Sequence, residues 1–226
     1  MLWSGIIAIT ALAWTYLIIM PMGAQSRLLD ATLMFLMWAV MMVAMMLPSA
    51  APMLSTYARI ASPREGSRPY HVWMFTAGYF VVWTAFSLAA TVLQYALQSV
   101  SIISNGLRTT SIAGGVILVA AGIYQLTPLK NVCLKRCRTP IGFFMTNWRD
   151  GASGAFKMGL EHGAFCTGCC WLLMALLFVA GVMNLAWVAA LSVLVLLEKA
   201  APFGRAIALA SGVAMIAAGL VLAIRF

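Results

Sequence analysis

The sequence predicts an all-α, polytopic transmembrane helix bundle of about seven spans, folded as a single transmembrane domain over residues 1–226 with no soluble domain. Of the 226 residues, 64% are hydrophobic and only 8% are charged, whereas soluble domains carry roughly a quarter charged residues. The apolar residues fall in runs long enough to cross a bilayer. The net charge of +9 lies in the short loops between those runs. This distribution favours the lipid bilayer as a partner and argues against nucleic acid.

Seven apolar segments follow one another along the chain. They cover residues 2–20, 28–47, 72–97, 111–126, 156–182, 185–197 and 204–224. The first is interpreted as a retained span because no clear small-residue cleavage site follows it. The second is expected to end at Pro48 and Pro52, since proline removes a helix hydrogen bond. The sixth is short and crosses the bilayer only if Glu198 and Lys199 reach or pair at its end; if it is re-entrant, the count is six.

The basic residues predict an orientation. With a cytoplasmic amino terminus, every Lys and Arg falls in an inner loop except Arg27, Arg108 and Arg225. Positive charge accumulates on the cytoplasmic side of membrane proteins. We therefore expect a multi-pass protein of the bacterial inner (plasma) membrane, with residues 129–157 as a cytoplasmic connecting segment that contains cysteines. Prolines and glycines in that segment argue against one continuous helix there.

The second apolar segment is rich in methionine. Met34, Met37, Met41 and Met45 are spaced by three, four and four, and Met42 and Met46 form a second pair spaced by four. Thioethers are soft, neutral ligands that suit cuprous copper without adding charge to the bilayer. Methionine also packs irregular helix interfaces without any metal. From spacing alone, packing is favoured over ligation.

Two cysteines lie in the connecting segment. Cys133 and Cys137 are spaced by four, which suits one helical turn or a chelate across a loop. The flanking cations Lys135, Arg136 and Arg138 favour the thiolate form, although they oppose the binding of a divalent cation. The alternative is a pair of ordinary cytosolic thiols. Because the chain has five cysteines, an odd number, at least one is expected to be unpaired or bound to metal.

The most distinctive stretch runs from residue 158 to 174. It holds Glu161, His162, Cys166, Cys169 and Cys170 in an otherwise apolar segment. On a helix, the imidazole and the first two of these thiols fall on one face. Such groups are costly in hydrocarbon and are usually functional there. Mixed Cys and His sites bind soft transition metals, with copper favoured and zinc as the alternative.

A structural interpretation of this stretch stays open, because small buried cysteines let helices approach closely. Gly159, Gly163 and Gly168 support it, since small residues serve helix contacts. They would equally leave room for an ion. The predicted orientation brings the methionines, the loop cysteines and this stretch to one depth, in the inner half of the bilayer, which predicts one shared site.

Four motifs in this order resemble a bacterial family of integral membrane proteins with predicted metal binding. The motifs are MWAVMMVAMMLPSAAPM, LTPLKNVCLKRCRTP, GLEHGAFCTGCCWLLM and LLEKAAPFGR. The resemblance covers residues from about 30 to 215. It implies a multi-span inner-membrane protein with metal ligation at Cys133, Cys137, His162, Cys166, Cys169 and Cys170.

The leading functional hypothesis is a protein that binds a soft transition metal and acts in its transport, sensing or delivery, with a membrane or metallochaperone partner. The competing class is an enzyme, a membrane thiol–disulfide oxidoreductase that relays electrons between Cys133/Cys137 and Cys166/Cys169. It is less favoured because the methionines and His162 have no role in thiol exchange. A third class is a structural subunit of a larger membrane complex, in which the cysteines only pack.

Overall fold

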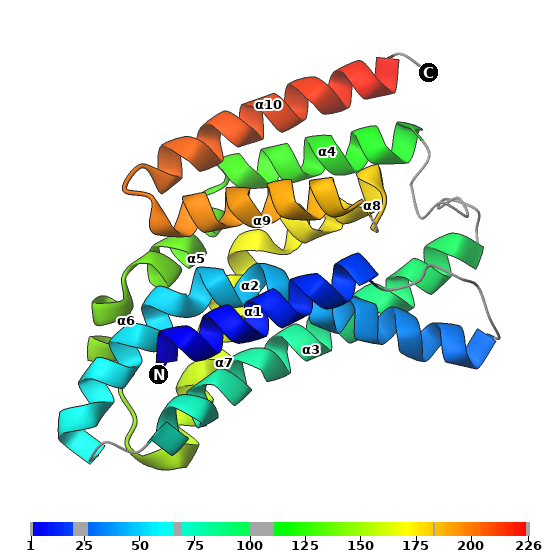
Figure 1. Ribbon diagram of the computed structural model, residues 1–226. Helices are drawn as coiled ribbons and strands as arrows, with labels where there is room; N and C mark the ends of the chain where they lie inside the picture. The colour runs from blue at the N-terminus through cyan, green and yellow to red at the C-terminus, as the bar shows by residue number, and fades with distance from the viewer. Residues whose placement is uncertain (1, 20–26, 66–68, 100–110, 183, 225–226) are drawn as a thin grey trace. The chain divides into compact units, whose positions relative to one another are not determined.

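A computed structural model describes residues 2–19, 27–65, 69–99, 111–182 and 184–224, and every regular element in these ranges is a helix (Figure 1). The elements are α1 (Leu2–Ile19), α2 (Arg27–Glu65), α3 (Pro69–Ser99), α4 (Ser111–Leu126), α5 (Pro128–Arg138), α6 (Pro140–Asn147), α7 (Gly151–Ala175), α8 (Leu177–Ala180), α9 (Leu185–Ala200) and α10 (Gly204–Ile224). The all-α prediction is confirmed. Arg68, Arg108 and Arg225, which entered the orientation argument, lie outside the described residues.

Four helical segments of the described chain are long and apolar enough to cross a membrane. They are Ala31–Ala61, Tyr70–Ser99, Gly151–Val179 and Gly204–Ile224. A fifth arises if α4 and α5, which are bent by 66° at their junction, form one broken span. A span needs about 20 apolar residues, so α9, with 16 residues, falls short. The fold is compatible with a membrane protein of four or five spans, and the count of seven stays a prediction.

The expectation that the second helix ends at Pro48 and Pro52 is wrong, because α2 continues to Glu65. Prolines are tolerated inside membrane helices where neighbouring hydroxyl groups and helices satisfy the backbone. Here the Ser49 hydroxyl donates to the Met46 carbonyl at 2.9 Å. The Thr56 hydroxyl donates to the Pro52 carbonyl at 2.8 Å. Hydroxyl groups thus bond to the helix backbone around both prolines.

The connecting segment behaves as expected, since residues 129–157 do not form one helix. α5 ends at Arg138, and Pro140 occupies the first turn of α6, where a missing N–H costs nothing. Gly151 then begins α7 with a positive φ of 76°, which glycine adopts without a steric penalty.

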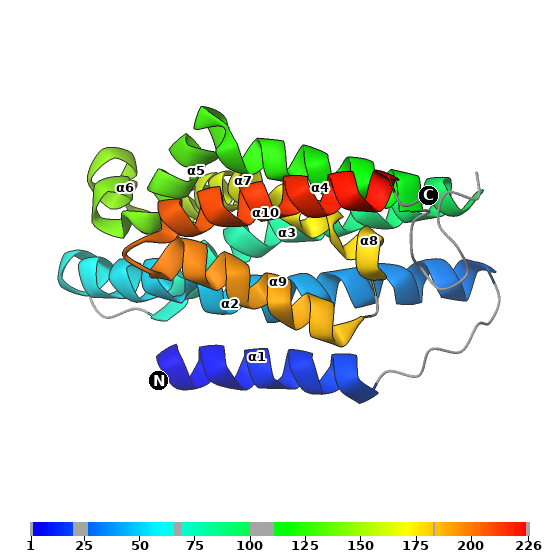
Figure 2. The same ribbon diagram turned by 90° about the horizontal axis from the view of Figure 1, so that it is seen from above.

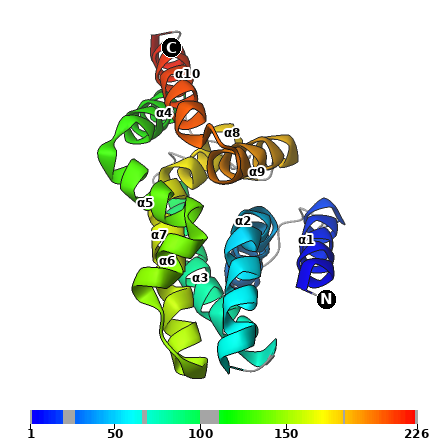
Figure 3. The same ribbon diagram turned by 90° about the vertical axis from the view of Figure 1, so that its left-hand side faces the viewer.

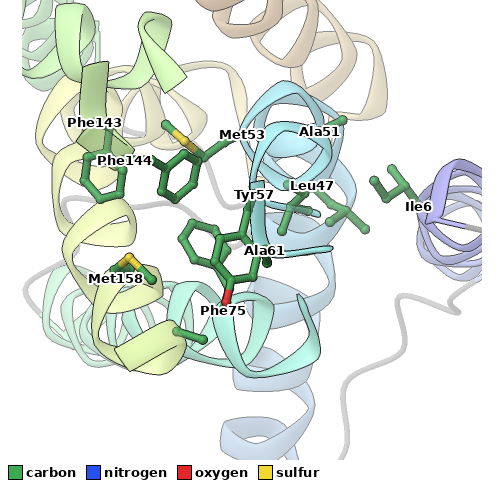
Figure 4. Close-up of a cluster of buried hydrophobic side chains, with 12 residues drawn as sticks. Ile6, Leu47, Ala51, Met53, Tyr57, Ala61, Phe75, Phe143, Phe144 and Met158 are labelled. Atoms are coloured by element: carbon green, nitrogen blue, oxygen red, sulfur yellow. The ribbon is translucent and has the colours of Figure 1, made fainter. Parts of the chain in front are cut away.

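The chain divides into two compact units. Unit 1 contains Met1–Thr91 and Lys135–Thr167, and unit 2 contains Val92–Leu134 and Gly168–Phe226. In unit 1, α1 runs alongside α2 (Figure 2). The core of unit 1 is aromatic: Tyr57 stacks on Phe75 with ring centroids 5.0 Å apart and lies 5.6 Å from Phe144 (Figure 4). These rings join α2, α3 and α6 into one buried cluster.

Glycines let α3 and α7 approach closely within unit 1. A Cβ on Gly78 would overlap the carbonyl oxygen of Phe156, and a Cβ on Gly159 would overlap that of Phe75. A Cβ on Gly163 would come within 3.0 Å of Val82. The helix-packing role expected of Gly159 and Gly163 is therefore confirmed.

In unit 2, glycines likewise let α4 and α10 approach closely, and the two helices lie side by side in Figures 1 and 3. A Cβ on Gly115 would come within 2.9 Å of the Gly219 carbonyl oxygen, and one on Gly122 within 2.6 Å of that of Gly212. The two glycine pairs are spaced by seven on both helices, so they recur on one helix face every second turn. Backbone-to-backbone packing therefore holds this helix pair together.

Candidate metal site

Unit 2 brings Cys133 of α5 against α7 at Gly168. A Cβ on Gly168 would lie only 3.1 Å from the Cys133 Sγ, so the thiol occupies space that any larger residue would take. Cys133 and Cys169 are close enough for their charges to interact. Cys133 is a partly buried free thiol, whereas Cys169 is 1% exposed. The loop cysteine therefore lies against α7 at the residue that precedes Cys169, and a shared metal site at these two thiols stays a prediction.

Residues at the end of α4 and just after it hold Cys133 of α5 close to Gly168 of α7. Thr127 caps α5: its hydroxyl oxygen accepts the Lys130 N–H at 3.3 Å, and Pro128 fills the first helical position. The Tyr124 hydroxyl donates to the Gly168 carbonyl, and its ring meets Trp171 edge-on at 5.9 Å. Tyr124 also lies within electrostatic range of Cys133, Cys169 and Cys170. One tyrosine thus ties the end of α4 to the part of α7 that carries two thiols.

A second group of polar side chains lies in unit 1 around Tyr79 of α3. The Tyr79 hydroxyl is hydrogen-bonded to the Cys166 Sγ at 3.2 Å and donates to the Met46 carbonyl at 3.3 Å. The His162 ring stacks on Tyr79 at a centroid distance of 5.5 Å and on Phe75 at 6.0 Å. The methionine-rich helix and the Glu-His-Cys stretch therefore meet in this unit through Tyr79.

The methionines expected to line the path of an ion are all interior. Met41, Met42, Met45 and Met46 are each at most 1% exposed. This burial agrees with the packing interpretation of the stretch. Burial is also compatible with neutral thioether ligands for a soft ion, and the role of these methionines as ligands stays a prediction.

Two other predicted ligands have structural partners. The Glu161 carboxylate accepts a hydrogen bond from Arg149 Nη2 at 2.7 Å in a surface ion pair. Cys137 is buried on α5 and belongs to unit 1. Beside it, the Arg136 guanidinium lies 5.0 Å from the centre of the Phe165 ring, a distance suited to a cation–π contact.

Sequence reasoning missed the tyrosines and a buried charged network in unit 2. Lys130 Nζ donates to Glu198 Oε2 at 2.6 Å, and the two side chains are 1% and 2% exposed. Gln125 Nε2 donates to Glu198 Oε1 at 2.7 Å. The sequence places Lys130 among the inner-loop charges and offers Glu198 only its neighbour Lys199 as a partner. The available signal was a carboxylate at the end of an apolar run, because such a group needs a buried partner.

Most of the predicted metal ligands are sulfur atoms of cysteine and methionine, which are soft donors. Among the described side chains, no group of three or more His, Cys, Asp or Glu residues is arranged to hold a metal ion. What these side chains offer is, in unit 2, the Cys133 thiol packed against the residue before Cys169 and, in unit 1, a thiol and an imidazole that both contact Tyr79. Thiolate and thioether ligands select cuprous copper over harder ions.

Comparison with known proteins agrees with this chemistry. No curated protein and no solved structure matches the chain significantly. The sequence model of the family PpoB2, described as copper chaperone, matches residues 35–222. The match includes the methionine-rich part of α2, all five cysteines and most of α10. The metal-binding family expected from the motifs is confirmed, and the chain belongs to the PpoB2 copper chaperone family.

Proposed function

We propose that this protein is a membrane-embedded copper chaperone that holds cuprous copper, as cargo, between the thiolates of Cys133 and Cys169. The observation that carries the proposal is the placement of the Cys133 Sγ against Gly168, one residue before Cys169. Membership of the copper chaperone family supports the choice of metal. Several helices with the length and apolarity of membrane spans support the membrane location.

The two thiols differ in access, and this suits a cargo site. Cys133 is partly exposed, whereas Cys169 is almost fully buried. Copper arriving from a metallochaperone partner would first meet Cys133 and then gain Cys169 as its second ligand. Both thiols lose their protons when they bind metal, so loading releases protons and weakens as the pH falls. A site with few ligands also exchanges its cargo readily, because an incoming thiolate finds an open coordination position.

The proposal includes a second binding site for copper(I) in unit 1, made of soft ligands. Cys166 and His162 lie beside Tyr79, which also bonds the Met46 backbone. Neutral thioethers at Met41, Met42, Met45 and Met46 would accept a monovalent ion in an apolar layer without adding charge. The proposal includes an inner-membrane location with about seven spans and a cytoplasmic amino terminus, which puts the Cys133 segment on the cytoplasmic side.

Copper titration of single cysteine variants tests the proposal. Copper(I) affinity would be measured by competition with a chromophoric chelator, on protein purified in detergent under reducing conditions. Cys133→Ser and Cys169→Ser should each lose tight binding, because either change leaves one thiolate. Cys137→Ser is the matched control, since it removes a thiol from the same helix but from unit 1, and it should keep this site. Equal affinity in wild type and the first two variants would overturn the proposal.

The contact that suits copper also suits disulfide exchange, so the oxidoreductase alternative needs its own test. Thiol trapping followed by gel electrophoresis would reveal a Cys133–Cys169 disulfide that forms and breaks with the redox poise of the buffer. The copper proposal instead predicts thiols that stay reduced and become protected when copper is added. A reversible disulfide in copper-free protein, with no copper protection, would favour the enzyme.

A further inference from the structure

A buried ion-pair network in unit 2 lies one helical turn from Cys133. We define the α5 latch as Lys130 on α5, Glu198 on α9 and Gln125 on α4. The Lys130 ammonium contacts both of the others: it donates to Glu198 Oε2 at 2.6 Å and to Gln125 Oε1. Gln125 Nε2 also donates to Ser211 of α10 at 2.9 Å. The latch therefore fastens the short helix α5 to three other helices of its unit.

The latch and the thiol share one side of α5. Lys130 and Cys133 are three residues apart on α5, so their side chains are neighbours on the helix surface, with Cβ atoms about 5–6 Å apart. α5 leaves α4 at a bend of 66° next to Thr127, and the bend interrupts the regular helix there. Holding Lys130 therefore fixes both the rotation and the height of α5 at Cys133.

We propose that the α5 latch positions Cys133 against Cys169, and that Lys130 and Glu198 are positioning residues for the copper site. A buried ion pair is stable only as a pair, because removing one partner leaves an uncompensated charge in a dry environment. A swing of α5 about its bend of 66° would hydrate that charge, and it would carry Cys133 away from Gly168. The contacts of Lys130 and Glu198 do not depend on the proposed copper function. Only their expected effect on copper binding rests on that proposal.

Alkylation of Cys133 in copper-free protein tests the latch directly. The rate of N-ethylmaleimide modification of Cys133 would be followed by peptide mass spectrometry on the full-length protein in detergent. Lys130→Met and Glu198→Gln should each raise this rate severalfold. Lys157→Met removes the same charge from an exposed position on α7, away from the cysteines of α5 in the sequence, and should not change the rate. Wild-type rates in Lys130→Met and Glu198→Gln would overturn the proposal.

A charge-reversed variant, Lys130→Glu/Glu198→Lys, keeps the test decisive if the single variants do not fold. Gln125 can serve either arrangement because its amide both donates and accepts hydrogen bonds. The reversed pair should restore the slow wild-type alkylation, and a fast rate in a folded reversed variant would overturn the latch.

Measurements of copper(I) affinity then distinguish the proposed copper site from the proposed α5 latch. Lys130→Met should weaken copper(I) binding by at least about tenfold, the loss seen when groups that orient metal ligands are removed. If wild type and Cys133→Ser bind copper equally, the copper site fails, while the alkylation rates still decide the latch. If wild type binds tightly and Lys130→Met binds equally well, the latch fails and the copper site stands.

Discussion

Gly159→Ala should loosen the contact between α3 and α7 and destabilise unit 1. The added Cβ would overlap the Phe75 carbonyl oxygen and would lie 2.9 Å from the Phe75 carbonyl carbon and 3.1 Å from the Tyr79 nitrogen. Atoms in van der Waals contact need about 3.5 Å or more. All three atoms belong to the backbone of α3, so no side chain can rotate away and the two helices must separate.

The expected cost follows from two opposing effects. Overpacking costs about 1–3 kcal/mol, and a backbone obstacle puts this site at the upper end or above. Alanine favours the helix over glycine by about 1 kcal/mol. The net loss should therefore be about 2 kcal/mol or more. The change should also disturb the His162–Tyr79 stack, because the tyrosine follows Phe75 by one turn.

Gly5→Ala is the matched control, because a Cβ on Gly5 of α1 meets nothing within 4 Å. It keeps the gain in helix propensity without the clash, so its stability should equal or slightly exceed that of wild type. Reversible unfolding in mixed detergent micelles, followed by circular dichroism, measures both variants. If Gly159→Ala unfolds at the same denaturant concentration as Gly5→Ala, the close helix contact and the reasoning built on it are refuted.

Three further changes probe the rest of the molecule. Gly168→Ala should weaken copper(I) binding about tenfold in chelator competition. It should cost little stability, since the added Cβ meets a movable thiol at 3.1 Å. Unchanged copper affinity would show that Cys133 is not a ligand. Tyr79→Phe should lower the free energy of unfolding by about 1 kcal/mol and speed alkylation of Cys166, because it removes the hydroxyl 3.2 Å from that thiol. An unaltered alkylation rate would contradict the hydrogen bond between Tyr79 and Cys166. Arg149→Gln should cost less than about 1 kcal/mol in chemical unfolding, since its pair with Glu161 is 49% and 34% exposed; a larger loss would mean that the pair matters to the fold.

Apolar runs predicted the helices well because a long apolar segment satisfies its backbone hydrogen bonds internally when it is helical. The prolines of α2 misled the prediction, since proline was treated as it behaves in water. In this helix, hydroxyl groups at Ser49 and Thr56 bond to the surrounding carbonyls. Ser49 directly follows Pro48, and Thr56 lies four residues after Pro52, so the combination of proline with Ser or Thr was the signal to weigh.

The candidate site was only partly predictable. Cys133 and Cys169 were named from their chemistry, but the predicted orientation gave only a common depth in the bilayer and not the packing of Cys133 against Gly168. Tyr79 and Tyr124 were not named, because a tyrosine in an apolar run looks like any other large packing residue. The buried partners of Lys130 were not predicted for a related reason: a lysine near a loop is usually solvated, and only the fold reveals its contacts with Glu198 and Gln125.

The glycines of α7 show that helix packing and ligand placement are not competing explanations. Gly159 lets the α3 backbone approach, and that approach carries the Tyr79 hydroxyl to Cys166. Gly168 leaves the space that the Cys133 thiol occupies. A short polar side chain on one helix reaches a partner on another when the two backbones come close, and glycine permits the closest approach. Replacing a glycine should therefore disturb the nearest thiol more than a substitution of similar size elsewhere on α7, which alkylation rates of Cys133 and Cys166 in Gly168→Ala and Gly159→Ala would measure.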